Sequence, residues 1–216
     1  MPNLEAVIFD VDGTLVDTSD YITHAYQHAL EQHGLPYRTR EEIASQIGKK
    51  LEDCYAFLAP GAQHELLIAT HRAFQAENIS LVKPFNYTEQ LLEGLSSRGI
   101  HKALFTSRKN VGPSLEVAGV NPEEFDIIID GAMVTKGKPD PEGLYTILNY
   151  LDKRASSVMM VGDAAVDILA GKNAGVATTV GVTHGFGTRE ELESAIPDHI
   201  IDSLGFLLPI IDNINV

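Results

Sequence analysis

Two aspartates one residue apart, Asp10 and Asp12, are the side chains of this sequence best suited to do chemistry. They follow a short apolar run that starts at Ala6. In an extended chain, a spacing of two residues directs both carboxylates to the same side. Like charge raises the proton affinity of one carboxylate unless a cation lies nearby. A nucleophile and a general acid/base is therefore the natural division of roles between them.

Further polar groups follow later strand-like runs of the chain. In open α/β sheets, ligands bind outside the carboxyl ends of the strands, so we expect these groups to meet at one edge of the sheet. The groups are Thr106-Ser107-Arg108-Lys109, the loop Lys136-Gly137-Lys138-Pro139, and Gly162-Asp163 with Asp167 beyond it.

Asp163 and Asp167 are four residues apart at a predicted helix start, so we expect them on one helix face. Negative charge also stabilises a helix N-terminus, and simple capping by a solvated acidic pair is an equal alternative for these two residues. Together with Asp10, Asp163 would complete an oxygen-rich cluster of the kind that Mg²⁺ takes. An EF-hand calcium loop is excluded, because its sixth position would be Leu15 rather than glycine and its twelfth Tyr21 rather than glutamate.

The turn after Asp12 offers a second means of binding a substrate. Gly13 and the backbone that follows it would leave amides exposed, and such amides hold phosphate oxygens in other glycine-bearing turns after strands.

The elements that must position these groups are of two kinds. Residues 19–78 show helical patterns alone, including a capping box that starts at Thr39. We expect a helical domain over residues 17–83, threaded into a core made of residues 1–16 and 84–216. Its hinges are expected at residues 16–19 and 81–87.

The core should be an α/β fold, a Rossmann-like doubly wound parallel sheet with the all-α insertion as a helical cap domain. The first strand ends a continuous apolar run, as a strand covered on both faces does, and is expected at the centre. The predicted strands are 6–10, 102–106, 126–129, 157–161, 177–182 and 199–201. The predicted core helices are 89–98, 111–118, 140–151, one that follows Gly162-Asp163 and runs to Ala174, and 189–195, with a last one from Ser203.

Composition narrows the classes of function. The 216 residues carry a net charge of -14, which argues against binding to nucleic acid or to an anionic membrane surface. No apolar run approaches the roughly 20 residues needed to span a bilayer, and the start of the sequence has no signal-peptide pattern. We expect a cytoplasmic protein, a monomer or a homodimer, whose lone Cys54 serves packing rather than chemistry.

Four segments of the chain resemble, in order and spacing, the four motifs of the haloacid dehalogenase superfamily of phosphohydrolases. The inserted helices are similar to its type 1 cap, and residues 181–188 with the tail 198–211 resemble its phosphoglycolate phosphatase-like branch. The four segments are Asp10-Val11-Asp12-Gly13-Thr14-Leu15, Thr106-Ser107, Lys138-Pro139-Asp140-Pro141, and Gly162-Asp163 through Asp167.

This resemblance implies a phosphatase of small phosphorylated metabolites that works through an aspartyl-phosphate. Asp10 would attack phosphorus, while Asp12 would protonate the leaving oxygen and later activate water. Asp10 and Asp163 would bind Mg²⁺ together with the backbone carbonyl of Asp12, and Asp167 would hold a water on the metal. Such roles suit phosphoryl transfer, which needs positioning and charge neutralisation above all.

The resemblance also implies the contacts to substrate. Thr106 and Lys138 would grip the transferring phosphoryl group. Lys49 or Lys50, beside Gly48, would meet an anionic end of the substrate, although a plain charged loop is the alternative there. Two departures, Ser107 in place of asparagine and Ala164 in place of serine, bear on substrate contacts rather than on the reaction. The expected substrate-binding residues are Gly13, Thr14, Ser107, Arg108 and Lys49.

Three alternatives remain open on the sequence. A phosphosugar mutase or a pyrophosphatase of the same superfamily would share the core chemistry. A non-catalytic phospho-acceptor or binding protein would also carry an aspartate on an α/β sheet, but receiver-type domains carry it on a middle strand and lack a helical insertion.

Overall fold

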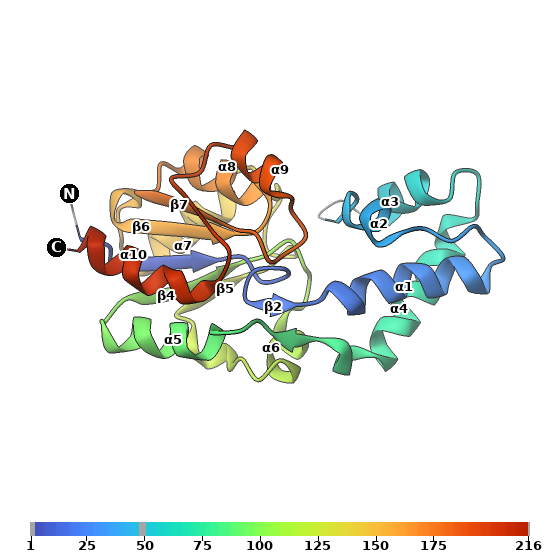
Figure 1. The fold of residues 1–216 in the computed structure, drawn as a ribbon, viewed down its shortest axis with the longest axis horizontal. Helices are drawn as coiled ribbons and strands as arrows, with labels where there is room; N and C mark the ends of the chain where they lie inside the picture. The colour runs from blue at the N-terminus through green and yellow to red at the C-terminus, as the bar shows by residue number, and fades with distance from the viewer. Residues whose placement is uncertain (1–2, 48–50, 216) are drawn as a thin grey trace. The chain divides into compact units, whose positions relative to one another are not determined.

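The computed structural model describes residues 3–47 and 51–215. Six parallel strands form one sheet in the order β5-β4-β1-β6-β7-β8, and the expectation of a doubly wound α/β fold is confirmed (Figure 1). The strands are β1 (Ala6–Phe9), β4 (His101–Phe105), β5 (Ile127–Ile129), β6 (Val158–Gly162), β7 (Thr178–Val182) and β8 (His199–Ile201).

Strand β1 lies in the interior of the sheet, between β4 and β6. Its Ile8 pairs with Ala103 on one side and Met160 on the other. Ala6 and Ile8 belong to an apolar cluster that includes residues of α7 (Glu142–Leu151) and α8 (Ala165–Ala174). Because successive side chains alternate between the faces of a sheet, Val7 and Phe9 face the other way, and both are fully buried too. Burial on both faces explains why the run is apolar without alternation.

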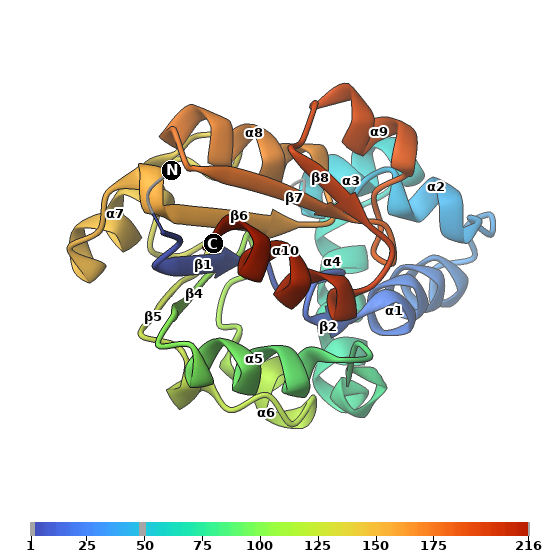
Figure 2. The ribbon, with the colours of Figure 1, turned by 60° about the vertical axis from the view of Figure 1, so that its left-hand side comes forward.

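Helices cover both faces of this sheet (Figure 2). Helix α5 (Thr88–Ser97) lies against β4 and packs on α10 (Leu207–Ile214), while α7 and α8 pack on β4, β5, β6 and β7. The remaining helices of this unit are the short α6 (Gly112–Val117) and α9 (Arg189–Ser194). Within the part of the chain that is described, no helix has both the length and the apolar character needed to cross a bilayer.

The two connections to the helical insertion pair with each other. Strands β2 (Val16–Asp17) and β3 (Lys83–Pro84) form a short antiparallel ribbon at positions where the sequence indicated only hinges. The Leu15 carbonyl strengthens this junction by accepting hydrogen bonds from the Phe85 amide at 3.0 Å and the Thr88 hydroxyl at 2.9 Å. Each of these strands has only two residues, which is too short for a periodic pattern. The sequence therefore carried no signal for this ribbon.

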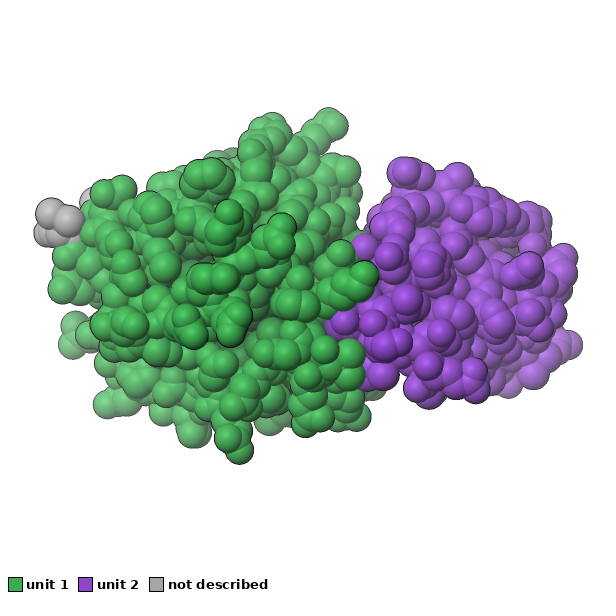
Figure 3. Space-filling view, turned by 60° about the horizontal axis from the view of Figure 1, so that its bottom comes forward, with its two compact units in different colours: residues 1–17, 83–216 green, residues 18–82 purple. Residues whose placement is uncertain are grey.

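Residues 18–82 form a second compact unit, coloured separately from residues 1–17 and 83–216 in Figure 3. Its helices are α1 (Ser19–Gln32), α2 (Arg40–Ala44), α3 (Leu51–Leu58) and α4 (His64–Glu77). The capping box expected at Thr39 is present on α2. The unit has its own apolar core, whose buried members are Tyr26, Ala29, Leu30, Ile43, Cys54, Tyr55, Leu58, Ala59, Leu67 and Ile68.

Candidate active site

Four groups that lie far apart in the sequence meet at the carboxyl edge of the sheet. Asp10 directly follows β1, Asp163 directly follows β6, and Asp167 lies in the first turn of α8. The loop after β5 brings Lys138, whose Nζ atom lies 2.5 Å from an oxygen of Asp10 and 2.5 Å from an oxygen of Asp167. Its side chain is only 2% exposed, so this ammonium group is enclosed by the acids that it binds.

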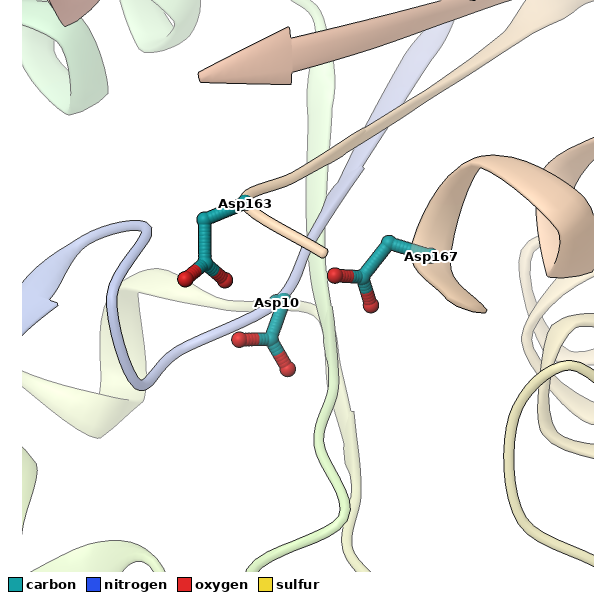
Figure 4. Close-up of side chains that lie close together, drawn as sticks. All are labelled: Asp10, Asp163 and Asp167. Atoms are coloured by element: carbon teal, nitrogen blue, oxygen red, sulfur yellow. The ribbon is translucent and has the colours of Figure 1, made fainter. Parts of the chain in front are cut away.

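The carboxylates of Asp10, Asp163 and Asp167 form one cluster (Figure 4). Each offers an oxygen within 4.8 Å of the others, and all three residues are buried. Three carboxylates against one ammonium group leave an excess of negative charge away from water, which is costly unless a cation compensates it. Carboxylate oxygens arranged in this way suit a hard divalent cation.

The expectation that Asp163 and Asp167 share a helix face is wrong. Helix α8 begins at Ala165 with Ala164 at its N-cap, so Asp163 belongs to the turn between β6 and the helix. Asp167 is on the helix, where its Oδ2 accepts a hydrogen bond from the Ala164 amide at 3.0 Å. The pair therefore meets across the turn, and Asp167 both caps the helix through Oδ2 and binds Lys138 through Oδ1.

The loop after β7 holds Asp163 in place. The Phe186 amide donates to Oδ2 of Asp163 at 2.7 Å, and the Thr14 hydroxyl donates to Oδ1 at 3.3 Å. A Cβ atom on Gly185 would lie 2.2 Å from that same Oδ2, so the chain approaches the carboxylate as closely as glycine allows. His184 links this loop to the turn after Asp12, since its Nε2 lies 3.0 Å from the Thr14 carbonyl oxygen.

Sequence reasoning noticed this loop only as part of a family resemblance and assigned it no role in the site. Gly185 and Gly187, shortly after the predicted strand 177–182, were the available signal, because glycines near strands often mark a close approach of the backbone to a functional group.

The turn after Asp12 differs from its expected use. The Gly13 amide donates to the Val16 carbonyl at 2.9 Å and the Thr14 amide to the Val11 carbonyl at 3.2 Å, and both residues are buried. The prediction that this turn exposes its amides to a phosphate is therefore wrong, because the turn uses them to close itself. Gly13 is needed for another reason: its φ is +84°, and a Cβ atom there would lie 2.2 Å from Oδ2 of Asp163.

Asp12 is bound by Arg108, which comes from the loop after β4. Nε of Arg108 lies 2.8 Å from Oδ2 of Asp12, and Nη2 lies 2.6 Å from Oδ1. The two side chains are 15% and 16% exposed, so the pair is largely shielded from water. Sequence reasoning placed Arg108 among the substrate-binding residues and did not foresee its pairing with Asp12.

The remaining expected residues lie in or beside the same loop, or outside the described chain. Thr106 is buried directly after β4, and its hydroxyl oxygen accepts from the Arg108 amide at 3.1 Å. Ser107 is exposed. Lys49 and Lys50 lie outside the residues that the structure describes.

The electrostatics of the site follow from burial and crowding of like charge. Burial and repulsion from Asp167 raise the pKa of Asp163 to about 7, and burial raises the pKa of Asp10 well above the ordinary aspartate value. Burial works against the charge of Lys138, but its two carboxylate partners outweigh that effect and raise its pKa. The lysine therefore stays protonated, and its single positive charge is too little to compensate the three carboxylates around it.

Fold and site together define a class: a doubly wound α/β protein with a carboxylate cluster and a buried lysine at the carboxyl edge of its sheet. Residues 7–181 match the profile of the haloacid dehalogenase-like hydrolases, and the chain belongs to this family. It is accordingly an enzyme, a hydrolase.

Similar proteins match over nearly their whole length. The chain is 32% identical to a protein named pyrophosphatase PpaX from Anoxybacillus flavithermus, with 97% of each covered. A crystal structure of a predicted phosphoglycolate phosphatase from Haemophilus somnus has a TM-score of 0.89 at 22% identity, covering 97% of this chain and 99% of that one. A predicted phosphatase from Clostridium acetobutylicum has a TM-score of 0.81 at 26% identity, covering 98% and 100%.

Proposed function

We propose that this enzyme is a Mg²⁺-dependent phosphatase that hydrolyses small phosphorylated metabolites through a phosphorylated Asp10. The observation that carries the proposal is the enclosed contact of Asp10 with Lys138 beside the other two carboxylates. A nucleophile, a fixed positive charge and a place for a divalent cation are what phosphoryl transfer requires.

The first half of the reaction uses Asp10 and Asp12. An oxygen of Asp10 forms a bond to phosphorus, while the bond from phosphorus to the leaving oxygen breaks. That oxygen takes a proton from the Asp12 carboxyl group, and the leaving group departs. A carboxylate is a competent nucleophile here because the covalent intermediate divides one difficult step into two easier ones.

The second half returns both acids to their starting state. Asp12, now a carboxylate, takes a proton from a water molecule as its oxygen attacks phosphorus. The bond between phosphorus and the Asp10 oxygen breaks, and inorganic phosphate leaves. Asp10 is again a carboxylate and Asp12 again carries the proton for the next cycle.

The rest of the cluster supplies charge and position. Lys138 would meet the oxygens of the transferring phosphoryl group, and the hydroxyl of Thr106 would add a hydrogen bond. Asp10, Asp163 and Asp167 fit a Mg²⁺ ion by donor type, together with the carbonyl oxygen of Asp12. When bound, Mg²⁺ would supply positive charge that offsets both the carboxylates and the phosphoryl oxygens.

Two substrate classes are supported, and both are small anions. A phosphomonoester of the phosphoglycolate type is favoured by the resemblance of residues 181–188 and 198–211 to the phosphoglycolate phosphatase-like branch of the family. Pyrophosphate is the second candidate, because relatives 31% and 32% identical over nearly the whole chain are named pyrophosphatases. We propose the helical unit of residues 18–82 as the cap that chooses between leaving groups.

Phosphate release from 2-phosphoglycolate and from pyrophosphate tests the function. We expect release that requires Mg²⁺, stops with a chelator, and falls by roughly a thousandfold or more in Asp10→Asn, as loss of a covalent nucleophile does. Asp212→Asn, on the surface beside Arg98, is the matched control and should keep full activity. Turnover by Asp10→Asn at the wild-type rate would exclude the proposed mechanism.

A further inference from the structure

Arg108 holds both oxygens of the residue that has to deliver the proton. We propose that Arg108 determines specificity: it releases Asp12 when the substrate's leaving group brings a second anionic group, and binds that group instead. This inference rests on the proposed function and names the substrate class of the same site, esters whose leaving group is itself an anion.

The backbone of Arg108 is fixed, so the exchange involves its side chain alone. Its amide donates to the Thr106 hydroxyl oxygen at 3.1 Å, and its carbonyl accepts from the Gly131 amide at 3.0 Å. A Cβ atom on Gly131 would lie 2.2 Å from the Ser107 carbonyl oxygen, which shows how tightly this loop packs. The proposed exchange therefore needs only rotation of the Arg108 side chain, with its backbone held in place after β4.

The pair with Asp12 obstructs the chemistry for as long as it is intact. A guanidinium group has five donors and no acceptor, so it can only use up the lone pairs of a carboxylate. Nε lies within hydrogen-bond distance of both Asp12 oxygens, at 2.8 and 3.1 Å, and Nη2 takes the second oxygen at 2.6 Å. Arg108 pairs with Asp12 as a carboxylate, whereas the leaving oxygen needs a proton on Asp12, so the pair must open before Asp12 can carry that proton.

What the leaving group carries decides how easily the pair opens. Separating a shielded ion pair is costly if either charge is left without a partner. A carboxylate or phosphate on the leaving group matches the guanidinium fork and replaces Asp12 as its partner. A neutral alkyl or aryl leaving group offers no such replacement, so Arg108 stays on Asp12 and slows proton transfer.

The test compares two substrate classes in matched variants. Pyrophosphate and 2-phosphoglycolate have anionic leaving groups, while ethyl phosphate and phenyl phosphate have neutral ones. The variants are Arg108→Gln, which loses the charge, Arg108→Lys, which keeps a charge without the fork, and Arg98→Gln as a control in a surface ion pair. Each is assayed for kcat/KM with Mg²⁺ after its thermal unfolding has shown a folded protein.

We expect Arg108→Gln to lower kcat/KM for the two anionic-leaving substrates on the order of 100-fold, the usual effect of removing one partner of a shielded charge pair. For the neutral-leaving substrates we expect an unchanged or raised value, because Asp12 is freed. Arg108→Lys should fall between, and Arg98→Gln should match wild type.

Equal losses on both classes, or no loss on the anionic one, overturn the inference. If Arg108→Gln does not fold, the same comparison in Arg108→Lys decides. A wild-type enzyme without activity on any of the four esters overturns the proposed function and the inference with it, whereas an active wild type with equal losses in the variants overturns the inference alone.

Discussion

Asp163 is the most closely confined side chain of the site. Glycines at 13 and 185 each bring backbone to a position where a Cβ atom would lie 2.2 Å from its Oδ2. At Gly187 a Cβ atom would lie 2.1 Å from the Asp163 carbonyl oxygen. Such enclosure fixes one orientation of the carboxylate, and groups that orient a metal ligand strongly affect metal binding.

Replacing Gly185 by alanine tests this confinement. The new methyl group overlaps the Asp163 carboxylate and also the Gly13 carbonyl oxygen, which lies 2.3 Å from the added Cβ atom. We expect both groups to shift, so that Mg²⁺ affinity falls by about 10- to 100-fold while the protein stays folded. Isothermal titration with Mg²⁺ measures the affinity without relying on activity.

Gly137→Ala is the matched control, because Gly137 is another loop glycine and a Cβ atom there would meet nothing within 4 Å. Equal Mg²⁺ affinity in Gly185→Ala and wild type would show that the loop after β7 does not set the geometry of Asp163.

At the scale of elements, β4 and α7 together support the lysine of the site. The Nζ atom of Lys138 lies 5.3 Å from the centre of the Phe105 ring at the end of β4. A Cβ atom on Gly143 of α7 would lie 2.3 Å from the same ring. The Phe105 ring therefore lies close to both α7 and Lys138. Gly143 permits the close approach of α7 to this ring.

Gly143→Ala is a test in which two effects oppose each other. Alanine favours a helix over glycine by about 1 kcal/mol. Overpacking against a ring that is only 1% exposed costs about 1–3 kcal/mol. We expect crowding to prevail, with a lower free energy of unfolding in urea and weaker catalysis because the Phe105 ring shifts under Lys138.

Gly112→Ala, at the start of α6 where nothing lies within 4 Å of an added Cβ, should show no such loss. A Gly143→Ala protein more stable than wild type would mean that the Phe105 ring moves aside at little cost.

At the scale of the whole molecule, the buried charge of the site predicts a folding stability that depends on pH and, with the proposed metal, on Mg²⁺. In the metal-free enzyme the pKa of Asp163 is raised from 3.8 to about 7, so between these values the folded state binds more protons than the unfolded state. Stability then falls as pH rises through this window. Burial also raises the pKa of Asp10, which acts in the same direction.

Thermal unfolding measures this linkage. With a chelator present we expect Tm to fall as pH rises from 5 to 7.5. If Mg²⁺ binds the ionised cluster as proposed, it should raise Tm more at pH 7.5 than at pH 5, because ligands that bind only the folded state stabilise it. Asp163→Asn should flatten the fall in chelator and reduce the effect of Mg²⁺. A Tm that rises across the same range in chelator would contradict the assigned charge state.

Much of the architecture could be predicted because it depends on local patterns. The apolar run at β1 indicated a strand covered on both faces, and the positions of glycine and proline marked most turns between strands and helices. Topology alone then placed Asp10, Lys138 and Asp163 at one edge, since parallel strands end at the same side of a sheet. The cluster of Asp10, Asp163 and Asp167 lies where that reasoning put it.

Only the tertiary structure decided which partners those side chains have. Arg108 and Asp12 are 96 residues apart, and Thr14 and Asp163 are 149 apart. Such pairs depend on which strands are neighbours and on how each loop packs, and no local pattern records that. A sequence pattern places a residue at the end of a strand, but the rotamer and hydrogen bonds of that residue are set by groups that reach it from distant parts of the chain.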